Sequence, residues 1–497
     1  MANSNVSNFM AAFPYQGLTF DDVSLITQYA AFLPAEASTR SKLTRNIELN
    51  IPYISAAMDT VTESEMAIAM ARLGGIGVIH KNLTPNEQSE EVKRVKLYLN
   101  GLIKNPVTFH PDQTVEFMLN KKEENKYTFS GFPIVNDEKK LLGIITRRDI
   151  KFVTDKRKKL KEIMVTKLVT ASESTELTEA FSIMMKQKIG KLPLINEKGI
   201  LTGLYSLQDV HSIIKNINPL YNRDNDHRLR VAAAIGPYDM ERADMLIKSG
   251  CDVIVIDTAH GHSKGVIDTI KSCKKEYPAI DIIAGNIGSE EGAAALLKAG
   301  ADAIKVGIGP GSICTTRVVA GVGVPQITAI YHAFKGVKGE IPIIADGGIK
   351  QSGDVAKAIV AGASTVMMGS VLAGTQESPG EKIFHKGRTY VIYRGMGSLE
   401  AMKASAGSRE RYGVSKDESN DNLVPQGVEG MVLFRGDVSS VLNQYVWGLK
   451  YSLGYCGART INELQENGIF IRVSEAGVKE AHPHDITITK DAPNYTL

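Results

Sequence analysis

The chain has 497 residues, more than one ordinary hydrophobic core accommodates, and this length predicts at least two domains. Its hydrophobic content of 43% is typical of a globular protein, and its formal net charge of +3 gives no case for binding to nucleic acid or to an anionic membrane. Four cysteines without a CxxC pair exclude a zinc framework and a disulfide scaffold, and favour a reducing, cytoplasmic setting.

A repeated pattern begins after a short opening segment at residues 18–25. Brief apolar runs that end in Gly, Asp, Asn or Ser alternate with amphipathic helical stretches. The first run, 53–59, precedes a helical stretch at 63–73, and the second run, 76–81, precedes one at 86–99. The pattern stops for more than a hundred residues and then resumes with six further runs, at 231–236, 253–259, 281–287, 303–309, 341–348 and 365–370. Residues 1–16 lack the regions of a signal peptide, and no apolar run is long enough to span a bilayer.

Near-continuous apolar runs alternating with helices predict an α/β fold whose parallel sheet is covered on its faces. Eight such units favour a (β/α)8 TIM barrel over an open sheet. Gly250, Gly300 and Gly362 each end a helical stretch, as C-cap glycines do. Polar residues and glycines follow the carboxyl ends of the runs, where barrel active sites lie.

Residues 307–316, GIGPGSICTT, form the most distinctive of these loops. Its glycines allow the backbone to approach a ligand closely, and successive N–H groups can form an anion-binding nest. Cys314, at its end, would then lie in an electropositive, accessible place that favours a nucleophilic thiolate. The alternative is a tight turn with a small buried cysteine, because free cysteine is usually an inert core residue. Cys251, Cys273 and Cys456 are interpreted as structural or unpartnered.

The interruption, residues 101–216, contains an internal repeat. A stretch from Gly131 to Asp149 recurs sixty residues later, from Lys191 to Asp209. A repeat seen twice suggests two units that pack on each other. It resembles a pair of CBS modules, or Bateman domain, and modules of that family bind adenine or guanine nucleotides. The segment holds 20 Lys and Arg against 14 Asp and Glu, which suits a nucleotide phosphate; the basic run at 156–161 alone is better explained as a solvated face.

Further motifs carry a second resemblance. They are Asp346-Gly347-Gly348, Met367-Met368-Gly369-Ser370, Tyr393-Arg394-Gly395-Met396-Gly397-Ser398, Arg411-Tyr412 and Gln426-Gly427-Val428. With the cysteine loop and the double insert, they resemble the family of inosine-5′-monophosphate (IMP) dehydrogenases over residues 18–486. This resemblance implies a catalytic barrel formed by residues 1–100 and 217–497, with a tandem CBS regulatory domain at 101–216 inserted in it.

The resemblance also implies an activity: NAD-dependent oxidation of IMP to xanthosine 5′-monophosphate, the committed step of guanine nucleotide synthesis, through a thioimidate on Cys314. It assigns catalytic roles to Cys314, Thr316, Arg411 and Tyr412. The phosphate positions are Ser312, Gly348, Gly369, Ser370 and Tyr393, the ribose position is Asp346, and the base positions are Gly395, Met396, Gly397 and Gln426.

Cofactor positions follow from the same resemblance. NAD would meet Asp257, Asn286 and Gly307; no G-x-G-x-x-G lies between a strand and a helix, so the residues alone do not predict a dinucleotide site. Potassium would be held by carbonyl groups of Gly309, Gly311 and Cys314 and, from a neighbouring subunit, of Glu475, Ala476 and Gly477. Such a shared site implies a homotetramer, which could pair into an octamer. His260 and His262 are better explained as a polar loop than as metal ligands.

Residues 403–430 form a long polar loop, typical of a lid. The segment resembles the family's mobile flap, which enters the vacated NAD site so that Arg411 and Tyr412 activate water. Two alternatives stay open: a reductase of guanosine 5′-monophosphate (GMP) that uses NADPH, and a non-catalytic nucleotide sensor. Reductases of that kind lack the CBS pair and the Arg-Tyr flap, and a sensor would not need the cysteine loop.

Overall fold

The computed structural model describes residues 3–14, 16–98, 102–104, 106–125, 127, 129, 131–215, 217–413 and 423–489. The chain forms two compact units. One consists of Met1–Val95, Leu220–Asn222 and Arg230–Leu497, and the other of Lys96–Pro219 and Arg223–Leu229. The expected domain bounds at residues 100, 101 and 216 lie outside the described residues, as does the acidic part of the expected flap, 417–421.

The first unit is built on a closed barrel of eight parallel strands in the order β11-β12-β13-β14-β15-β16-β4-β5. All eight expected strands are present, so the prediction of a (β/α)8 barrel is confirmed. Their apolar side chains are buried on both faces, because helices cover the outside and a core cluster fills the inside. The strands are β4 (Tyr53–Ser55), β5 (Ile76–Ile79), β11 (Ala232–Ile235), β12 (Val253–Asp257), β13 (Asp281–Ile287), β14 (Ala303–Val306), β15 (Ile343–Asp346) and β16 (Thr365–Met368).

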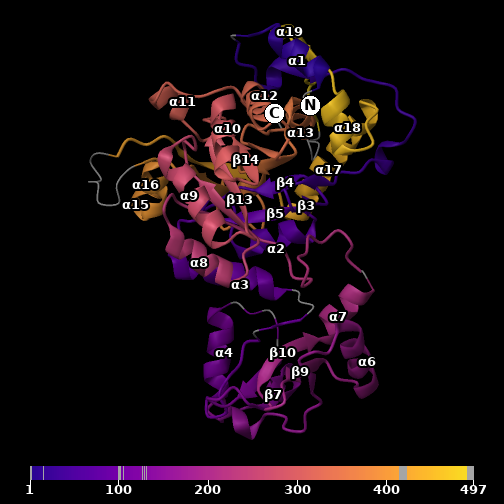
Figure 1. Ribbon diagram of the computed structural model, residues 1–497, viewed down its shortest axis with the longest axis vertical. Coiled ribbons are helices and arrows are strands. Elements are labelled where there is room, and N and C mark those ends of the chain that lie inside the picture. The colour runs from indigo at the N-terminus through magenta and orange to yellow at the C-terminus, as the bar shows by residue number, and fades with distance from the viewer. Residues whose placement is uncertain are drawn as a thin grey trace. The chain divides into compact units, whose positions relative to one another are not determined.

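Helices alternate with these strands and surround them (Figure 1). Gly300 and Gly362 follow two of the helices with φ of 105° and 123°, left-handed values that end a helix and that glycine adopts at little cost. The outer helices are α2 (Ser64–Arg72), α3 (Pro85–Tyr98), α8 (Met240–Lys248), α9 (Lys264–Glu276), α10 (Glu290–Ala299), α12 (Gln326–Val337), α13 (Ser352–Ala361) and α17 (Val438–Tyr455).

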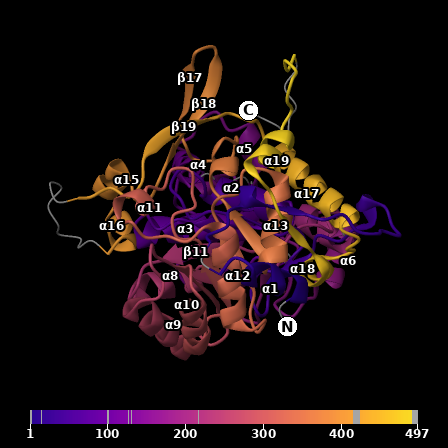
Figure 2. The same cartoon turned by 90° about the horizontal axis from the view of Figure 1, so that it is seen from above.

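Several shorter elements extend the barrel. The antiparallel sheet β17 (Lys382–His385), β18 (Arg388–Arg394) and β19 (Glu429–Leu433) ends in a hairpin that projects from the barrel (Figure 2). Helices α15 (Leu399–Ala404) and α16 (Ala406–Arg411) follow β18. Two one-turn helices, α11 (Thr316–Val319) and α14 (Ser370–Ala373), follow β14 and β16, and β1 (Val23–Leu25) pairs with β20 (Phe470–Arg472).

The second unit contains two matching strand–strand–helix groups, one for each copy of the repeat. They are β6 (Gly131–Val135), β7 (Leu141–Thr146) and α5 (Arg147–Lys151), and β9 (Lys191–Ile195), β10 (Leu201–Ser206) and α7 (Leu207–Ile214). Each group has its own hydrophobic cluster, completed by α4 (Val115–Glu124) and α6 (Leu177–Gln187) respectively. A backbone bridge between Lys140 and Ile200 joins the two groups.

None of the helices within the described ranges has the combination of length and apolar character that a membrane crossing requires.

Candidate active site

A cavity opens at the carboxyl ends of the barrel strands, and most of the residues expected in the site line it. Its volume is about 990 Å3 when the space open to solvent is included, which is enough for a nucleotide. The expected residues that line it are Asp257, Asn286, Gly307, Gly309, Gly311, Ser312, Cys314, Thr316, Asp346, Gly348, Gly369, Ser370, Tyr393, Gly395, Met396, Arg411, Tyr412 and Gln426.

Four expected residues do not line the cavity. Gly397 lies directly behind it: a Cβ at this position would be 2.5 Å from Cζ of Tyr412, so the tyrosine ring packs on the glycine backbone. The other three, Glu475, Ala476 and Gly477, form the start of α19 (Glu475–Glu480). Their expected role concerns a neighbouring subunit and stays a prediction.

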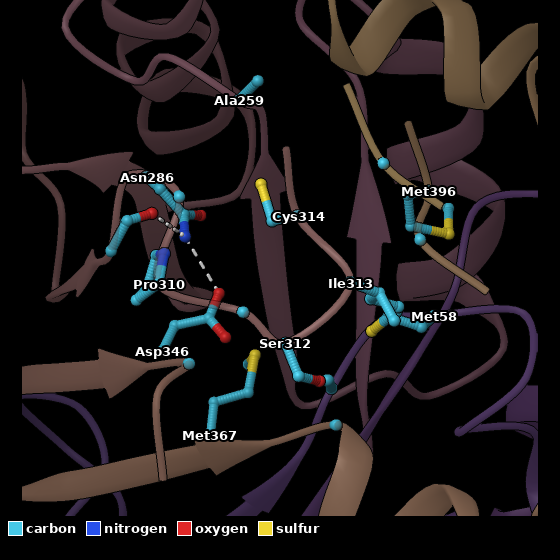
Figure 3. Close-up of a pocket in the computed structure, with 18 of the residues that line it drawn as sticks. Met58, Ala259, Asn286, Pro310, Ser312, Ile313, Cys314, Asp346, Met367 and Met396 are labelled. Carbon is cyan, nitrogen blue, oxygen red and sulfur yellow. Dashed lines mark hydrogen bonds between the residues drawn. The ribbon is translucent and has the colours of Figure 1, made fainter. Parts of the chain in front are cut away.

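The cysteine loop is held in place by residues 426–428. The Thr315 N–H donates to the Gln426 carbonyl at 3.0 Å, and the Val428 N–H donates to the Ile313 carbonyl at 2.9 Å. This short antiparallel pairing presents Cys314 to the cavity, where its Sγ lies 3.2 Å from Thr316 Oγ1. Figure 3 shows the sulfur between Asn286 on one side and Met396 on the other. The other three cysteines are buried, so Cys314 is the accessible thiol of the chain.

Arg317 stabilises the same loop by a hydrogen bond to its backbone, a role that the sequence analysis did not predict. Its Nε donates to the Ile308 carbonyl at 2.9 Å, and its Nη2 donates to the Val324 carbonyl at 2.6 Å. A Cβ at Gly309 would lie 2.7 Å from Arg317 Cγ, so the loop follows the arginine closely. Arg317 therefore fixes the path of the loop that leads to the cysteine.

Hydroxyl and backbone groups of Ser312, Gly369, Ser370 and Tyr393 also line the cavity. Tyr393 is hydrogen bonded to Ser312, and burial raises the pKa of its hydroxyl well above the ordinary value, so the group stays protonated and able to donate. Ser370 begins α14, and Gly369 precedes it. The Tyr393 hydroxyl packs against the Gly369 backbone, where a Cβ would lie 2.7 Å away. A phosphate would find neutral hydroxyl donors here.

A buried lysine on β14, also missed from sequence, links polar side chains on β12, β13 and β15. Lys305 on β14 is 1% exposed, and its Nζ donates to Asp257 Oδ1 at 2.8 Å and to Asp346 Oδ2 at 2.9 Å. It also contacts Asn286 Oδ1. Asn286 in turn donates to Asp346 Oδ2 at 2.9 Å (Figure 3). A lysine inside an otherwise apolar barrel strand was the signal that could have revealed this network, since a buried charge needs partners.

Arg411 reaches the other carboxylate oxygen of Asp257, Oδ2. The guanidinium forms an ion pair with Asp257, and the Ala259 N–H donates to the Arg411 carbonyl at 2.9 Å. Arg411 is also hydrogen bonded to the neighbouring Tyr412. Burial lowers the pKa of the Arg411 guanidinium and raises that of the Tyr412 hydroxyl. The structure thus places Arg411, Tyr412 and Cys314 on one cavity.

Gly307 can be tested as a structural requirement of the site. Its φ is 153°, and a Cβ there would lie 2.1 Å from the Asp346 carbonyl oxygen. We expect Gly307→Ala to lower the free energy of unfolding by about 2–4 kcal/mol, because both the backbone conformation and the contact forbid a side chain. Gly321→Ala is the matched control: its φ is 68° but nothing lies within 4 Å, so about 1 kcal/mol is expected. Urea unfolding measures both, and equal losses would contradict the argument.

Among the described residues, no three His, Cys, Asp or Glu side chains group as a metal site, and His260 and His262 belong to no such cluster.

The comparisons with known proteins agree on one family. A family described as IMP dehydrogenase / GMP reductase domain matches residues 17–484. Inosine-5′-monophosphate dehydrogenases from Halalkalibacterium halodurans and Bacillus subtilis are 50% and 49% identical to the chain, each over 98% of it and 99% of the relative. One from Aquifex aeolicus is 50% identical over 97% of this chain and 98% of its own. A solved structure of GMP reductase from Trypanosoma brucei, in complex with guanosine 5′-monophosphate, is similar with a TM-score of 0.87 and 39% identity, covering 96% of this chain and 99% of that one.

Proposed function

The chain belongs to the IMP dehydrogenase / GMP reductase family, and from this premise we propose how its cavity oxidises IMP to xanthosine 5′-monophosphate. The enzyme is an oxidoreductase of the IMP dehydrogenase type, and membership of the family implies the use of NAD. The observation that carries the proposal is the presence of an accessible cysteine, Cys314, on one cavity with the buried pair Arg411 and Tyr412.

Cys314 acts as the nucleophile. Carbon C2 of the purine lies between two ring nitrogens and is electron-poor, so the thiolate adds there and a carbon–sulfur bond forms. Loss of the hydride on C2, which NAD would accept when bound, makes the adduct a thioimidate and oxidises the purine. Water adds to C2, the carbon–sulfur bond breaks, and the thiolate is restored. Covalent catalysis of this kind divides one difficult reaction into two easier steps.

The Arg411–Tyr412 pair acts in the second step. A base must take a proton from the attacking water, and an ordinary guanidinium does not do so, because its pKa exceeds 12. Burial lowers the pKa of Arg411, although its ion pair with Asp257 opposes this, and the residue lines the same cavity as Cys314, whose adduct water attacks. Tyr412 orients the guanidinium through their hydrogen bond. Thr316, 3.2 Å from the sulfur, is a further polar group at the reacting atoms.

The remaining expected residues bind the substrate. The hydroxyls of Ser312, Ser370 and Tyr393, with the N–H groups of Gly348 and Gly369, hold the phosphate. Asp346 accepts hydrogen bonds from the ribose diol. The backbone at Gly395, Met396 and Gly397 and the amide of Gln426 bind the base.

The surroundings of the Asp257 carboxylate fit a nicotinamide ribose. Its carboxylate lines the cavity and already accepts from Lys305 and Arg411, so a ribose diol, which also donates, can replace the guanidinium. Asn286 and Gly307 complete this side. When bound, NAD accepts the hydride. Arg411 and the nicotinamide ribose therefore take turns at one carboxylate, which lets one cavity serve both steps.

We extend the proposal to potassium and to the assembly. Backbone carbonyl oxygens suit K+, and Gly309, Gly311 and Cys314 supply them from the cysteine loop, with Glu475, Ala476 and Gly477 of a neighbouring subunit as the other half. A homotetramer, able to pair into an octamer, follows from that sharing. The second unit binds ATP- or GTP-type nucleotides as a CBS pair, and a cytoplasmic location suits the substrates.

Incubation with IMP and NAD tests the proposal, with NADH absorbance as the readout. NADH formation that depends on both compounds is the expected result. The alternative, GMP reductase activity, has the similar solved structure in its favour, but Arg411 and Tyr412 on the cavity favour the dehydrogenase. Consumption of NADPH with GMP, without NADH formation from IMP, would replace the proposed reaction with the reductase reaction.

Deletion of residues 101–216 tests the regulatory role of the insert. Since the two units are each compact and all of the cavity lies in the barrel unit, we expect the deletion enzyme to retain NADH formation within about threefold, a change in barrier below about 0.7 kcal/mol. ATP and GTP should no longer affect the rate. A folded but inactive deletion enzyme, with a normal barrel circular-dichroism spectrum, would contradict a purely regulatory insert.

A further inference from the structure

A second buried lysine, Lys81, lies under the helix that carries Arg411 and has no role in the reaction described above. It follows β5, is 2% exposed, and its Nζ donates to the Asp257 backbone carbonyl at 3.3 Å. Three cationic side chains thus converge on Asp257: Lys81 on its backbone, and Lys305 and Arg411 on its carboxylate.

Helix α16 docks directly on the segment that contains Lys81. The Asn82 amide donates to Ser408 Oγ at 2.8 Å, and the Ser408 hydroxyl donates back to Asn82 Oδ1 at 3.1 Å. Ser408 is fully buried, and a Cβ at Gly407 would lie 2.8 Å from the Lys81 carbonyl oxygen. These contacts are neutral, so their contribution to the docking of α16 does not vary with pH.

Besides Asp257 at the end of β12, charged groups face Lys81 from two helices. Arg411 and Glu410 come from α16, and Arg242 and Asp239 come from the start of α8. Glu410 and the Lys81 ammonium both approach the end of β11: a Cβ at Gly236 would lie 3.1 Å from Glu410 Oε2 and 3.3 Å from Lys81 Nζ. When α16 is docked, it removes water from the ammonium and adds a second cation, Arg411, to the same small volume.

From this arrangement we propose that Lys81 is a positioning residue for α16, which docks with Arg411 in the cavity as Lys81 gives up its proton. The inference deepens the proposed function, in which Arg411 and the nicotinamide ribose alternate at Asp257, but in itself it requires only that α16 leaves and returns. In addition, the protonation of Lys81, which does not touch the substrate, governs the equilibrium between docked and undocked α16.

The direction of the pH dependence follows from the environment. Burial first, and the Arg411 charge second, lower the pKa of Lys81 from 10.5 to about 7 in the docked arrangement, although Glu410 opposes this. Without α16 the ammonium regains water and loses Arg411, so its pKa returns toward the ordinary value. Docking therefore leaves fewer protons bound. Below about pH 7 Lys81 is protonated whether α16 is docked or undocked, so the docking equilibrium does not vary with pH. Above about pH 7 the equilibrium constant for docking rises by at most tenfold per pH unit.

Hydrogen–deuterium exchange of the peptide that covers α16 tests the proposal on the full-length enzyme without ligands. After correction for intrinsic exchange, protection of this peptide in the unaltered enzyme should rise about tenfold from about pH 7 to about pH 8.5. In Lys81→Met, which keeps the volume without the charge, protection should be high and independent of pH. In Lys81→Arg, charged throughout, it should be low and independent of pH.

Two controls separate this effect from general loosening. Ser408→Ala removes the neutral contact, so it should lower protection about five- to tenfold at both pH values and keep the pH dependence. Lys403→Met, an exposed lysine on α15, should change nothing. An unchanged pH profile in Lys81→Met would overturn the proposal, as would equal protection in Lys81→Met and Lys81→Arg.

The same measurement distinguishes failure of this inference from failure of the proposed function. Addition of IMP with a non-reducible NAD analogue should abolish protection of α16 in all of these variants, because the analogue displaces Arg411. If the analogue leaves protection unchanged while Lys81→Met still removes the pH dependence, the alternation at Asp257 is wrong and the role of Lys81 stands.

Discussion

Replacing Cys314 by alanine is expected to lower the rate of NADH formation at least about 1,000-fold, because Cys314 is the one thiol among the residues that line the cavity. IMP affinity should change by less than about threefold, since the hydroxyl and backbone groups proposed to hold the phosphate are untouched. Steady-state NADH absorbance gives the rate, and equilibrium titration with IMP gives the affinity.

Cys314→Ser is the closest control for the loss of the sulfur. It keeps the size and hydrogen bonding of the side chain and should be almost as inactive, because a hydroxyl is a far weaker nucleophile than a thiolate at neutral pH. Mass spectrometry of the unaltered enzyme quenched during turnover should detect a nucleotide adduct on Cys314. Appreciable NADH formation by the alanine variant, or an adduct on a different residue, would refute the nucleophile assignment.

Replacing Arg411 by alanine is expected to slow hydrolysis by about 100- to 10,000-fold, the range for loss of a general base, while hydride transfer stays nearly normal. Rapid mixing with IMP and NAD should then give a burst of one NADH per active site followed by a very slow steady rate. The adduct on Cys314 should accumulate to nearly full occupancy and remain stable enough to isolate.

Arg409→Ala is the matched comparison for Arg411→Ala. Arg409 lies two residues earlier on α16, and its Nε donates to the Met402 carbonyl at 2.8 Å, whereas Arg411 pairs with Asp257. The change should reduce the steady rate by less than about tenfold and produce no burst. If both arginine variants slow hydride transfer and hydrolysis equally, α16 organises the cavity as a whole and Arg411 has no separate part in the water step.

Much of this fold was accessible from the sequence because parallel barrel strands are apolar throughout. The eight apolar runs are easily recognised. Because barrel active sites lie at the carboxyl ends of the strands, the sequence also predicts that distant residues such as Asp257, Asn286 and Asp346 share one face. The cysteine loop itself was ambiguous. The structure shows Cys314 paired through its backbone with residues 426–428, more than a hundred positions later, and no local pattern encodes that pairing.

The residues that escaped prediction are those whose roles depend on long-range contacts. Lys305 and Lys81 look like ordinary charges at or within apolar runs, and only the folded barrel places both at Asp257. Arg317 looks like a helix residue, although its side chain supports the loop before it. A cationic residue in an apolar run was the signal that could have revealed these contacts, since a buried cation needs carboxylates or carbonyl groups as partners.

The single ammonium of Lys305 has a consequence for attempts to redesign this enzyme. Because it is the shared counterion of Asp257 and Asp346, neutralising either carboxylate leaves the ammonium to the other alone. Changes at the two strands will therefore combine non-additively, with coupling of about 0.5–3 kcal/mol. Libraries that vary nucleotide preference and dinucleotide preference separately would miss the productive combinations, and the two positions are best varied together with Lys305.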